Sequence, residues 1–135
     1  MIKLVYCARR LPHLSREEFQ RYWRETHGPL VRGHAKTLRI RRYVQVHTLD
    51  NPINNVLRES RGALEAYDGV AELWWDSLED LAAVGASPEG QKATQELIED
   101  ERRFVDLERS ALWIGEEHSP PQRKPASQPG LAGAP

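Results

Sequence analysis

The sequence predicts a ferredoxin-like α+β domain, in which a four-stranded antiparallel sheet carries its helices on one face. Three observations lead to this fold class. The predicted elements follow one another in the order β-α-β-loop-β-α-β. Two Ser-x-x-acid helix starts, at Ser15 and Ser77, follow the first and third predicted strands. Residues 39–48 alternate strictly between two sets of side chains, as expected for a strand that has two different faces.

The boundaries of the elements follow from local signals. Residues 2–9 are apolar on both faces, which is typical of a central strand. Ser15 and Glu18 form a capping box, and Gly28-Pro29 is expected to end the helix and to hold His27 at its C-terminus. Asn, Pro and Gly predict a loop after the second strand. The expected elements are a strand at 2–9, helices at 16–26 and 30–38, a strand at 39–48, a loop at 50–67 with a short helical turn near 56–64, a strand at 70–76, helices from 78 to about 85 and from 88 to about 103, and a strand at 110–118.

The chain is expected to form one domain over residues 1–118, followed by a tail at 119–135. The tail contains five of the nine prolines and no aromatic residue. Such a segment cannot bury enough apolar surface to fold, so it is predicted to be disordered.

Composition excludes several classes of function. The formal net charge is −1, and the acidic and basic residues are interspersed, so neither nucleic acid nor a membrane surface is an expected partner. No apolar run approaches the length of about 18 residues that a membrane span needs. The single cysteine, Cys7, gives no sign of an oxidising compartment, and the cytoplasm is the expected location. The histidines lack zinc-ligand spacing and no Gly-rich phosphate loop is present, so neither a metal nor another cofactor is expected.

A sheet with helices on one side leaves its other face bare. Tyr43, Gln45 and His47 share one face of the second strand, and we expect this polar set on the bare face, with the apolar alternate set under a helix. Glu72 and Trp74, or the alternate residues of their strand, are expected beside them. The mixture is too apolar to stay in water, so a two-fold homodimer with a cavity between its two sheets is predicted.

Four separated blocks of the sequence resemble the EthD family. They are Phe19-x-x-Tyr22-Trp23-x-x-x-His27-x-Pro29-Leu30-Val31, Arg42-Tyr43-Val44-Gln45-x-His47, Tyr67-Asp68-Gly69-Val70-Ala71-Glu72-Leu73-Trp74 and Ser87-Pro88-Glu89. The resemblance covers residues 1–118 and implies a dimeric α+β barrel of ferredoxin-like protomers. It also implies a small-molecule pocket, since relatives of this kind act on aromatic polyketides as decarboxylases or dehydratases. His27, Tyr43, Gln45 and His47 are the positions that the shared motif carries over.

Two main functions remain open at this stage, with oxygen or haem chemistry as a lesser alternative. In the first, the protein is a cofactor-independent lyase or isomerase that decarboxylates, dehydrates or isomerises a small, largely apolar, aromatic or polyketide-like molecule. His27 and His47 would serve as base and acid and Tyr43 would stabilise an oxyanion, with Gln45, Glu72 and Trp74 binding the substrate. In the second, the protein is not an enzyme and sequesters a hydrophobic metabolite in the same cavity. A ladder of structural hydrogen bonds would explain the polar strand face without any chemistry.

Overall fold

The computed structural model describes residues 1–121 and residue 123. Its four strands form one antiparallel sheet in the order β2-β3-β1-β4. The strands are β1 (Ile2–Ala8), β2 (Arg42–His47), β3 (Gly69–Trp75) and β4 (Ala111–Glu116). The predicted fold class and the central position of the first strand are therefore confirmed. The tail predicted at 119–135 falls mostly outside the described residues.

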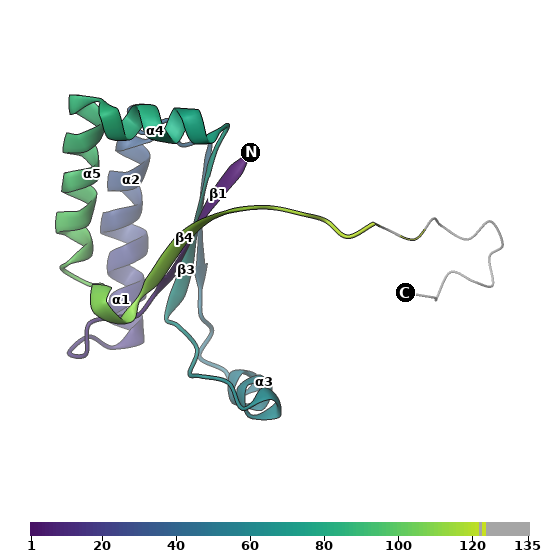
Figure 1. Cartoon of the computed structure of the whole chain (residues 1–135). Coiled ribbons are helices and arrows are strands. Elements are labelled where there is room, and N and C mark those ends of the chain that lie inside the picture. The colour runs from purple at the N-terminus through teal and green to yellow at the C-terminus, as the bar shows by residue number, and fades with distance from the viewer. Residues whose placement is uncertain (122, 124–135) are drawn as a thin grey trace.

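The helices form a layer against one face of the sheet, and the other face is open (Figure 1). In this layer, α4 crosses one end of α2 and α5 (Figure 1). The helix α3 (Ile53–Arg61) is set apart from this layer, beyond the end of the sheet (Figure 1). The elements of the layer are α1 (Arg16–Tyr22), the π-helical turn η1 (Trp23–His27), α2 (Gly28–His34), α4 (Leu78–Ala86) and α5 (Pro88–Glu101); the short 3-10 helix η2 (Leu107–Arg109) precedes β4.

One predicted boundary is wrong in an informative way. Gly28-Pro29 does not end the helix, because the chain stays helical from α1 through η1 into α2. The Gly28 N–H donates to the Trp23 carbonyl, five residues back, and this wider turn precedes Pro29, which has no N–H and would clash with a regular α-helical turn. His27 therefore lies within a continuous helical run and is buried, rather than ending a helix at the surface.

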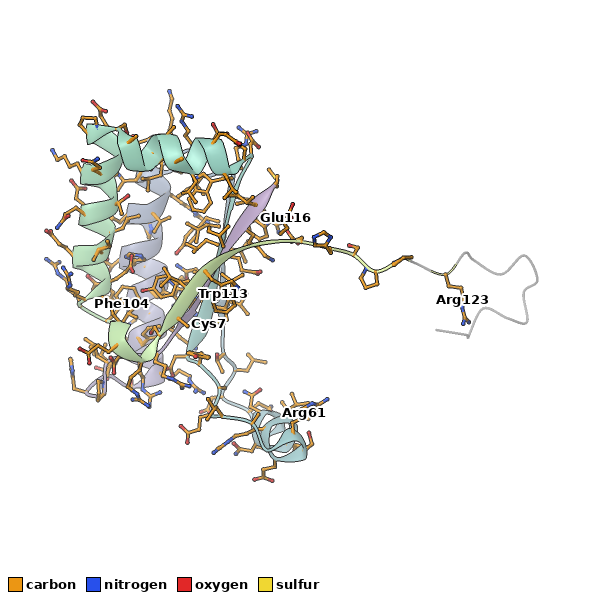
Figure 2. The ribbon with its side chains drawn as sticks, in the orientation of Figure 1. Cys7, Arg61, Phe104, Trp113, Glu116 and Arg123 are labelled. Carbon is orange, nitrogen blue, oxygen red and sulfur yellow. The ribbon has the colours of Figure 1, made fainter. Side chains whose placement is uncertain are left out.

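The core lies between the helices and the sheet. Phe19 is fully buried and its ring packs against those of Trp23 and Phe104, with centroids 5.6 and 5.4 Å apart. Figure 2 shows Phe104 in this layer, whereas Trp113 lies on the sheet. Gly69 allows the approach of the first helical segment, because a Cβ at this position would lie 2.8 Å from Cη2 of Trp23. Phe19 and Trp23 thus anchor the first helical segment to the core on this side of the sheet.

The register decides which residues share a face. Tyr43 pairs with Leu73, Leu73 with Leu4, and Leu4 with Ile114. Residues that pair across antiparallel strands point to the same side. Leu73, Leu4 and Tyr43 of this row pack into the helix-side core, where Leu73 is buried, while Ile114 on the edge strand is exposed. The next row, which contains Val44, Glu72, Val5 and Trp113, is on the open face.

The predicted face of the second strand is therefore reversed. Tyr43, Gln45 and His47 point toward the helices, while Val44 and Val46 are on the open face, where Val46 is 48% exposed. The prediction treated the polar set as unsuited to packing under a helix. Tertiary structure overrides that rule, because the backbone carbonyl of Trp23 and the Trp23 ring provide partners for polar side chains.

Candidate functional site

A cavity of about 270 Å³ lies between the helix layer and the sheet. Its wall is mostly aliphatic and aromatic, and side chains from β1, β2, β3 and all the helices of the layer except α1 contribute to it. Four of the side chains in this wall carry titratable groups. They are Tyr6, His27, Tyr43 and Glu101. Apolar walls with a few convergent polar groups are typical of small-molecule sites.

His27 is oriented by a buried carboxylate. Its Nδ1 lies 2.8 Å from Oδ2 of Asp100, and the Tyr22 hydroxyl donates to Oδ1 of the same residue at 2.6 Å. A carboxylate accepts, so Nδ1 carries the proton and Nε2 keeps its lone pair. Burial lowers the pKa of His27, although Asp100 opposes the shift, and the neutral ring is therefore favoured. This arrangement gives a neutral imidazole that can accept a proton at Nε2.

Glu101 brings a second titratable group to the cavity. Its Oε1 accepts a hydrogen bond of 2.7 Å from the Tyr6 hydroxyl. Burial raises the pKa of Glu101, and the neighbouring charge of Asp100 raises it further, while the bond from Tyr6 opposes the shift. Burial also raises the pKa of Tyr6. A carboxyl group whose pKa is raised can hold a proton and donate it near neutral pH.

Tyr43, Gln45 and His47 form a directed hydrogen-bond chain along β2. The Gln45 Oε1 lies 2.7 Å from Nε2 of His47, and Nε2 of Gln45 donates to the Tyr43 oxygen at 2.7 Å and to the Trp23 carbonyl at 3.0 Å. Because an amide oxygen only accepts, His47 is the donor in its pair with Gln45. The Tyr43 hydroxyl accepts at its oxygen, and its own proton stays available for a ligand. Burial raises the pKa of Tyr43, which favours this protonated donor form.

The predicted site residues divide into three groups. His27 and Tyr43 meet at the cavity. Gln45 and His47 lie behind Tyr43, and His47 is stacked on Trp23 with centroids 4.6 Å apart, outside the cavity wall. Glu72 and Trp74 face the opposite side of the sheet, so they are not brought together with the others. Lys3 donates to Glu72 at 2.7 Å, and the Arg42 guanidinium lies 4.7 Å from the Trp74 ring centroid.

Asp100 and Glu101 are absent from the sequence prediction. They lie in the stretch Glu99–Arg103, whose charge is typical of a solvated helix end. One signal could have found them. The apolar stripe that contains Ala93, Leu97 and Phe104 continues through positions 100 and 101 at helical spacing, so both carboxyl groups had to face the core. Carboxyl groups on a buried stripe are candidates for function.

The model of the EthD domain matches residues 11–108, which is well over half of the chain. The chain belongs to the EthD family. Solved structures also resemble the EthD chain. An EthD family protein from Bacillus halodurans is 22% identical, with a TM-score of 0.58, over 87% of this chain and 99% of its own. An EthD-like protein from Ralstonia eutropha is 18% identical, with a TM-score of 0.57, over 85% and 89% of the two chains.

A third similar structure is described as a dimeric protein of unknown function with a ferredoxin-like fold, from Bacteroides fragilis. It is 14% identical to the EthD chain, with a TM-score of 0.54, over 86% of this chain and 95% of its own. At these identities the likeness concerns the fold. The roles of individual residues in the EthD chain must therefore be argued from its own geometry.

Within residues 1–121 and 123, no three side chains of His, Cys, Asp or Glu gather as they would around a metal ion. In the same part of the chain, no helix combines the length and the apolar character that crossing a bilayer requires.

Proposed function

We propose that this EthD protein is a cofactor-independent enzyme that transfers protons on a small, largely apolar molecule bound between the helices and the sheet. The observation that carries the proposal is the joint presence, in one apolar cavity, of a carboxylate-oriented neutral imidazole and a partly buried carboxyl group. A carrier needs only the apolar volume. A base and an acid with opposite pKa shifts are what proton-transfer chemistry needs.

The steps of the proposed reaction balance without another reagent. Nε2 of His27 takes a proton from a carbon next to a carbonyl group. The electron pair of that C–H bond forms a carbon–carbon double bond, and the π pair of the carbonyl group moves onto its oxygen, which gives an enolate. The Tyr43 hydroxyl donates a hydrogen bond to the oxyanion. The carbonyl group then re-forms from the enolate, and protonated Glu101 supplies the proton that this step needs. If a carbon–carbon double bond is conjugated with the enolate, Glu101 protonates its far carbon, which is an isomerisation. If a hydroxyl group stands β to the carbonyl, its C–O bond breaks as a carbon–carbon double bond forms, and Glu101 protonates the departing oxygen, which leaves as water. Transfer of the proton from His27 to Glu101 restores both groups.

The charge of the cavity favours a neutral substrate. Neither lysine nor arginine is among the described residues of its wall, while Glu101 lies in the wall and Asp100 behind it. A carboxylate in this site would have no cationic partner and would be repelled by Asp100. Among the three predicted reactions, we therefore favour isomerisation or dehydration of a neutral ketone or phenol over decarboxylation of an acid. His47 then acts through Gln45 on Tyr43 and does not serve as the acid.

We also propose that the open face packs against the same face of a second copy. Trp113 and Val46 are 51% and 48% exposed on this face, and Val5, Val44 and Val70 share it. A contiguous apolar surface of this kind is unusual on a monomer. A two-fold dimer covers it with one interface, and the Bacteroides fragilis neighbour is described as dimeric. The cavity lies on the other side of the sheet, so each protomer would hold its own site.

The proton-transfer proposal is tested by hydrogen exchange into a neutral ketone. The probe is 2-tetralone, a bicyclic ketone with acidic C–H bonds beside its carbonyl group, in D2O. We expect the protein to accelerate deuterium incorporation, measured by proton NMR, and His27→Gln to lower the acceleration by about a hundredfold or more. The matched control is His34→Gln, because His34 pairs with Glu96 outside the cavity wall. Equal exchange by all three proteins would refute the proposed base.

The second function, sequestration of a hydrophobic metabolite, is favoured by the mostly aliphatic and aromatic wall. Calorimetric titration with 2-tetralone separates the two. An enzyme loses exchange but keeps binding within a few fold in His27→Gln. A carrier binds the ketone in both proteins and accelerates exchange in neither.

A further inference from the structure

A second cavity, of about 450 Å³, lies between the domain core and the α3 segment. We call it the arginine groove, because five of its lining residues are arginines from four parts of the chain: Arg9 and Arg10 after β1, Arg16 in α1, Arg58 in α3 and Arg109 in η2. Three carboxyl residues also line it, which leaves a formal excess of two positive charges. The groove and the cavity between helices and sheet share no lining residue.

Asp68 fixes the arginines at the bottom of the groove. Its side chain is only 5% exposed, and it accepts bonds from Nη1 of Arg10 at 2.6 Å, from the Arg10 backbone N–H at 2.8 Å and from Nε of Arg16 at 3.0 Å. Burial alone would raise the pKa of Asp68, but these bonds outweigh it and hold the pKa below its ordinary value. Asp68, which directly precedes β3, thus orients two guanidinium groups.

Several guanidinium N–H groups of the groove have no acceptor among the described residues of the protein. Arg16 uses Nε for Asp68, and neither of its Nη atoms has a hydrogen bond within the described residues. Arg109 is exposed, and its side chain forms neither a hydrogen bond nor an ion pair in that part of the chain. Arg9, by contrast, donates to the backbone oxygens of Glu65 and Ala66, and these two hydrogen bonds hold the loop after α3 against the core. The groove is thus built by some arginines, and others are left to contact a ligand.

We propose that the arginine groove binds a dianionic phosphate group, either free or carried by a small organic molecule. Guanidinium groups are planar donors that match the spacing of phosphate oxygens, and several of them converge here. The formal excess of two positive charges equals the charge of such a ligand. A single carboxylate would leave half of this excess unmatched. The proposal is independent of the proton-transfer chemistry, because it rests on different residues.

The test is calorimetric titration of the full chain with inorganic phosphate, phenyl phosphate and acetate at low ionic strength. We expect one binding site per chain for phosphate and for phenyl phosphate. The affinity for acetate should be weaker than that for phosphate by about tenfold or more. Tighter binding of phenyl phosphate than of phosphate would identify an organic phosphate as the ligand, and the reverse would identify the free ion. Either order agrees with the groove. Equal affinity for acetate and phosphate, or an absence of phosphate binding, would overturn the proposal.

A pair of variants separates the groove from general charge. Arg109→Gln removes a side chain without an intramolecular partner in the described residues, so the fold should be kept, and phosphate affinity should fall about tenfold. Arg61→Gln makes the same charge change on α3 outside the groove lining (Figure 2), and should leave the affinity within about twofold. Equal losses in both variants would show that phosphate responds to net charge rather than to the groove.

Discussion

The two faces of the sheet are formed by the same strands but differ in how their side chains are covered. On the helix side, Phe19 is fully buried and the polar groups of His27 and Glu101 each have a partner. On the open side, Trp113 stays half exposed, and charged side chains such as Lys3 and Glu72 pair with each other across the strands. One face is therefore largely covered by the helices of its own chain, whereas apolar side chains such as Trp113 stay exposed on the other. This difference suggests that chemistry belongs to the protomer and assembly to the open face.

The largest effect should come from truncating one aromatic side chain on each face. Phe19→Ala removes a fully buried ring from the core and should lower the free energy of unfolding by about 3–5 kcal/mol. Trp113→Ala removes a half-exposed ring and should cost the isolated protomer less than about 1 kcal/mol. Urea denaturation at low protein concentration measures both. If both variants lost a similar amount of unfolding free energy, this would contradict the distinction between the face covered by helices and the open face.

A charge on the open face should break the proposed dimer. Val46→Asp would bury an unpaired carboxylate between two sheets, and such a group costs an interface about 2–5 kcal/mol. Sedimentation should then show dissociation at concentrations where the wild type is dimeric. Leu78→Asp is the matched control, because Leu78 is also about half exposed but begins α4 in the helix layer rather than lying on the open face. A wild-type monomer at micromolar concentration would remove the basis of the dimer.

Substitutions at two glycines in the strands also compare the helix-side face with the open face. Gly69→Ala places a Cβ against the Trp23 ring and the Val46 carbonyl, and should lower the free energy of unfolding by about 1–3 kcal/mol through overpacking. Gly115→Ala adds the same carbon where no atom lies within 4 Å, and should change that energy by less than about 1 kcal/mol. Thermal unfolding followed by circular dichroism measures the pair. A reversed order would mean that Trp23 does not pack against β3 as closely as described.

The smallest effect concerns pH. Burial raises the folded-state pKa of Glu101 above its ordinary 4.5, so between those two values the folded protein binds a proton that the unfolded chain has lost. Unfolding free energy contributed by this group therefore falls as pH rises from about 4.5, by at most about 1.4 kcal/mol per pH unit. Glu101→Gln should remove that fall while keeping an acceptor for Tyr6. Urea titrations from pH 4.5 to 7.5 test it, and an unchanged slope would contradict a raised pKa.

The two shifts at the cavity also predict a pH profile for exchange into 2-tetralone. His27 must be neutral, and its lowered pKa keeps it so further below pH 6.5 than an ordinary histidine. Glu101 must be protonated, and its raised pKa extends that form above pH 4.5. The acid limb of the profile should therefore be lost in His27→Gln, while Glu101→Gln should flatten the alkaline limb. If the exchange rate instead changed with pH in one direction only, as it does without the protein, this would contradict the roles of His27 as base and Glu101 as acid.

The sequence by itself determined the elements and their order. Capping residues at Ser15, Ser77 and Ser87 set the helix starts, and the apolar first strand identified the centre of the sheet. These are local signals, since a cap needs only the next turn and a strand pattern only its own alternation. The motif that contains His27 and Tyr43 also identified the family and two side chains of the cavity wall.

Tertiary structure alone decided which face of each strand meets the helices. Alternation separates Tyr43 from Val44 but cannot say which set turns inward, because that depends on partners elsewhere in the chain. The Trp23 carbonyl and ring, placed by a π-helical turn, accept Gln45 and His47, and so bring the polar set under the helices. Asp100 and Glu101 joined the cavity for the same reason. In the sequence, their charges predict side chains that face solvent. In the structure, Asp100 pairs with Tyr22 and His27, and Glu101 accepts a hydrogen bond from Tyr6, so both carboxyl groups can turn inward.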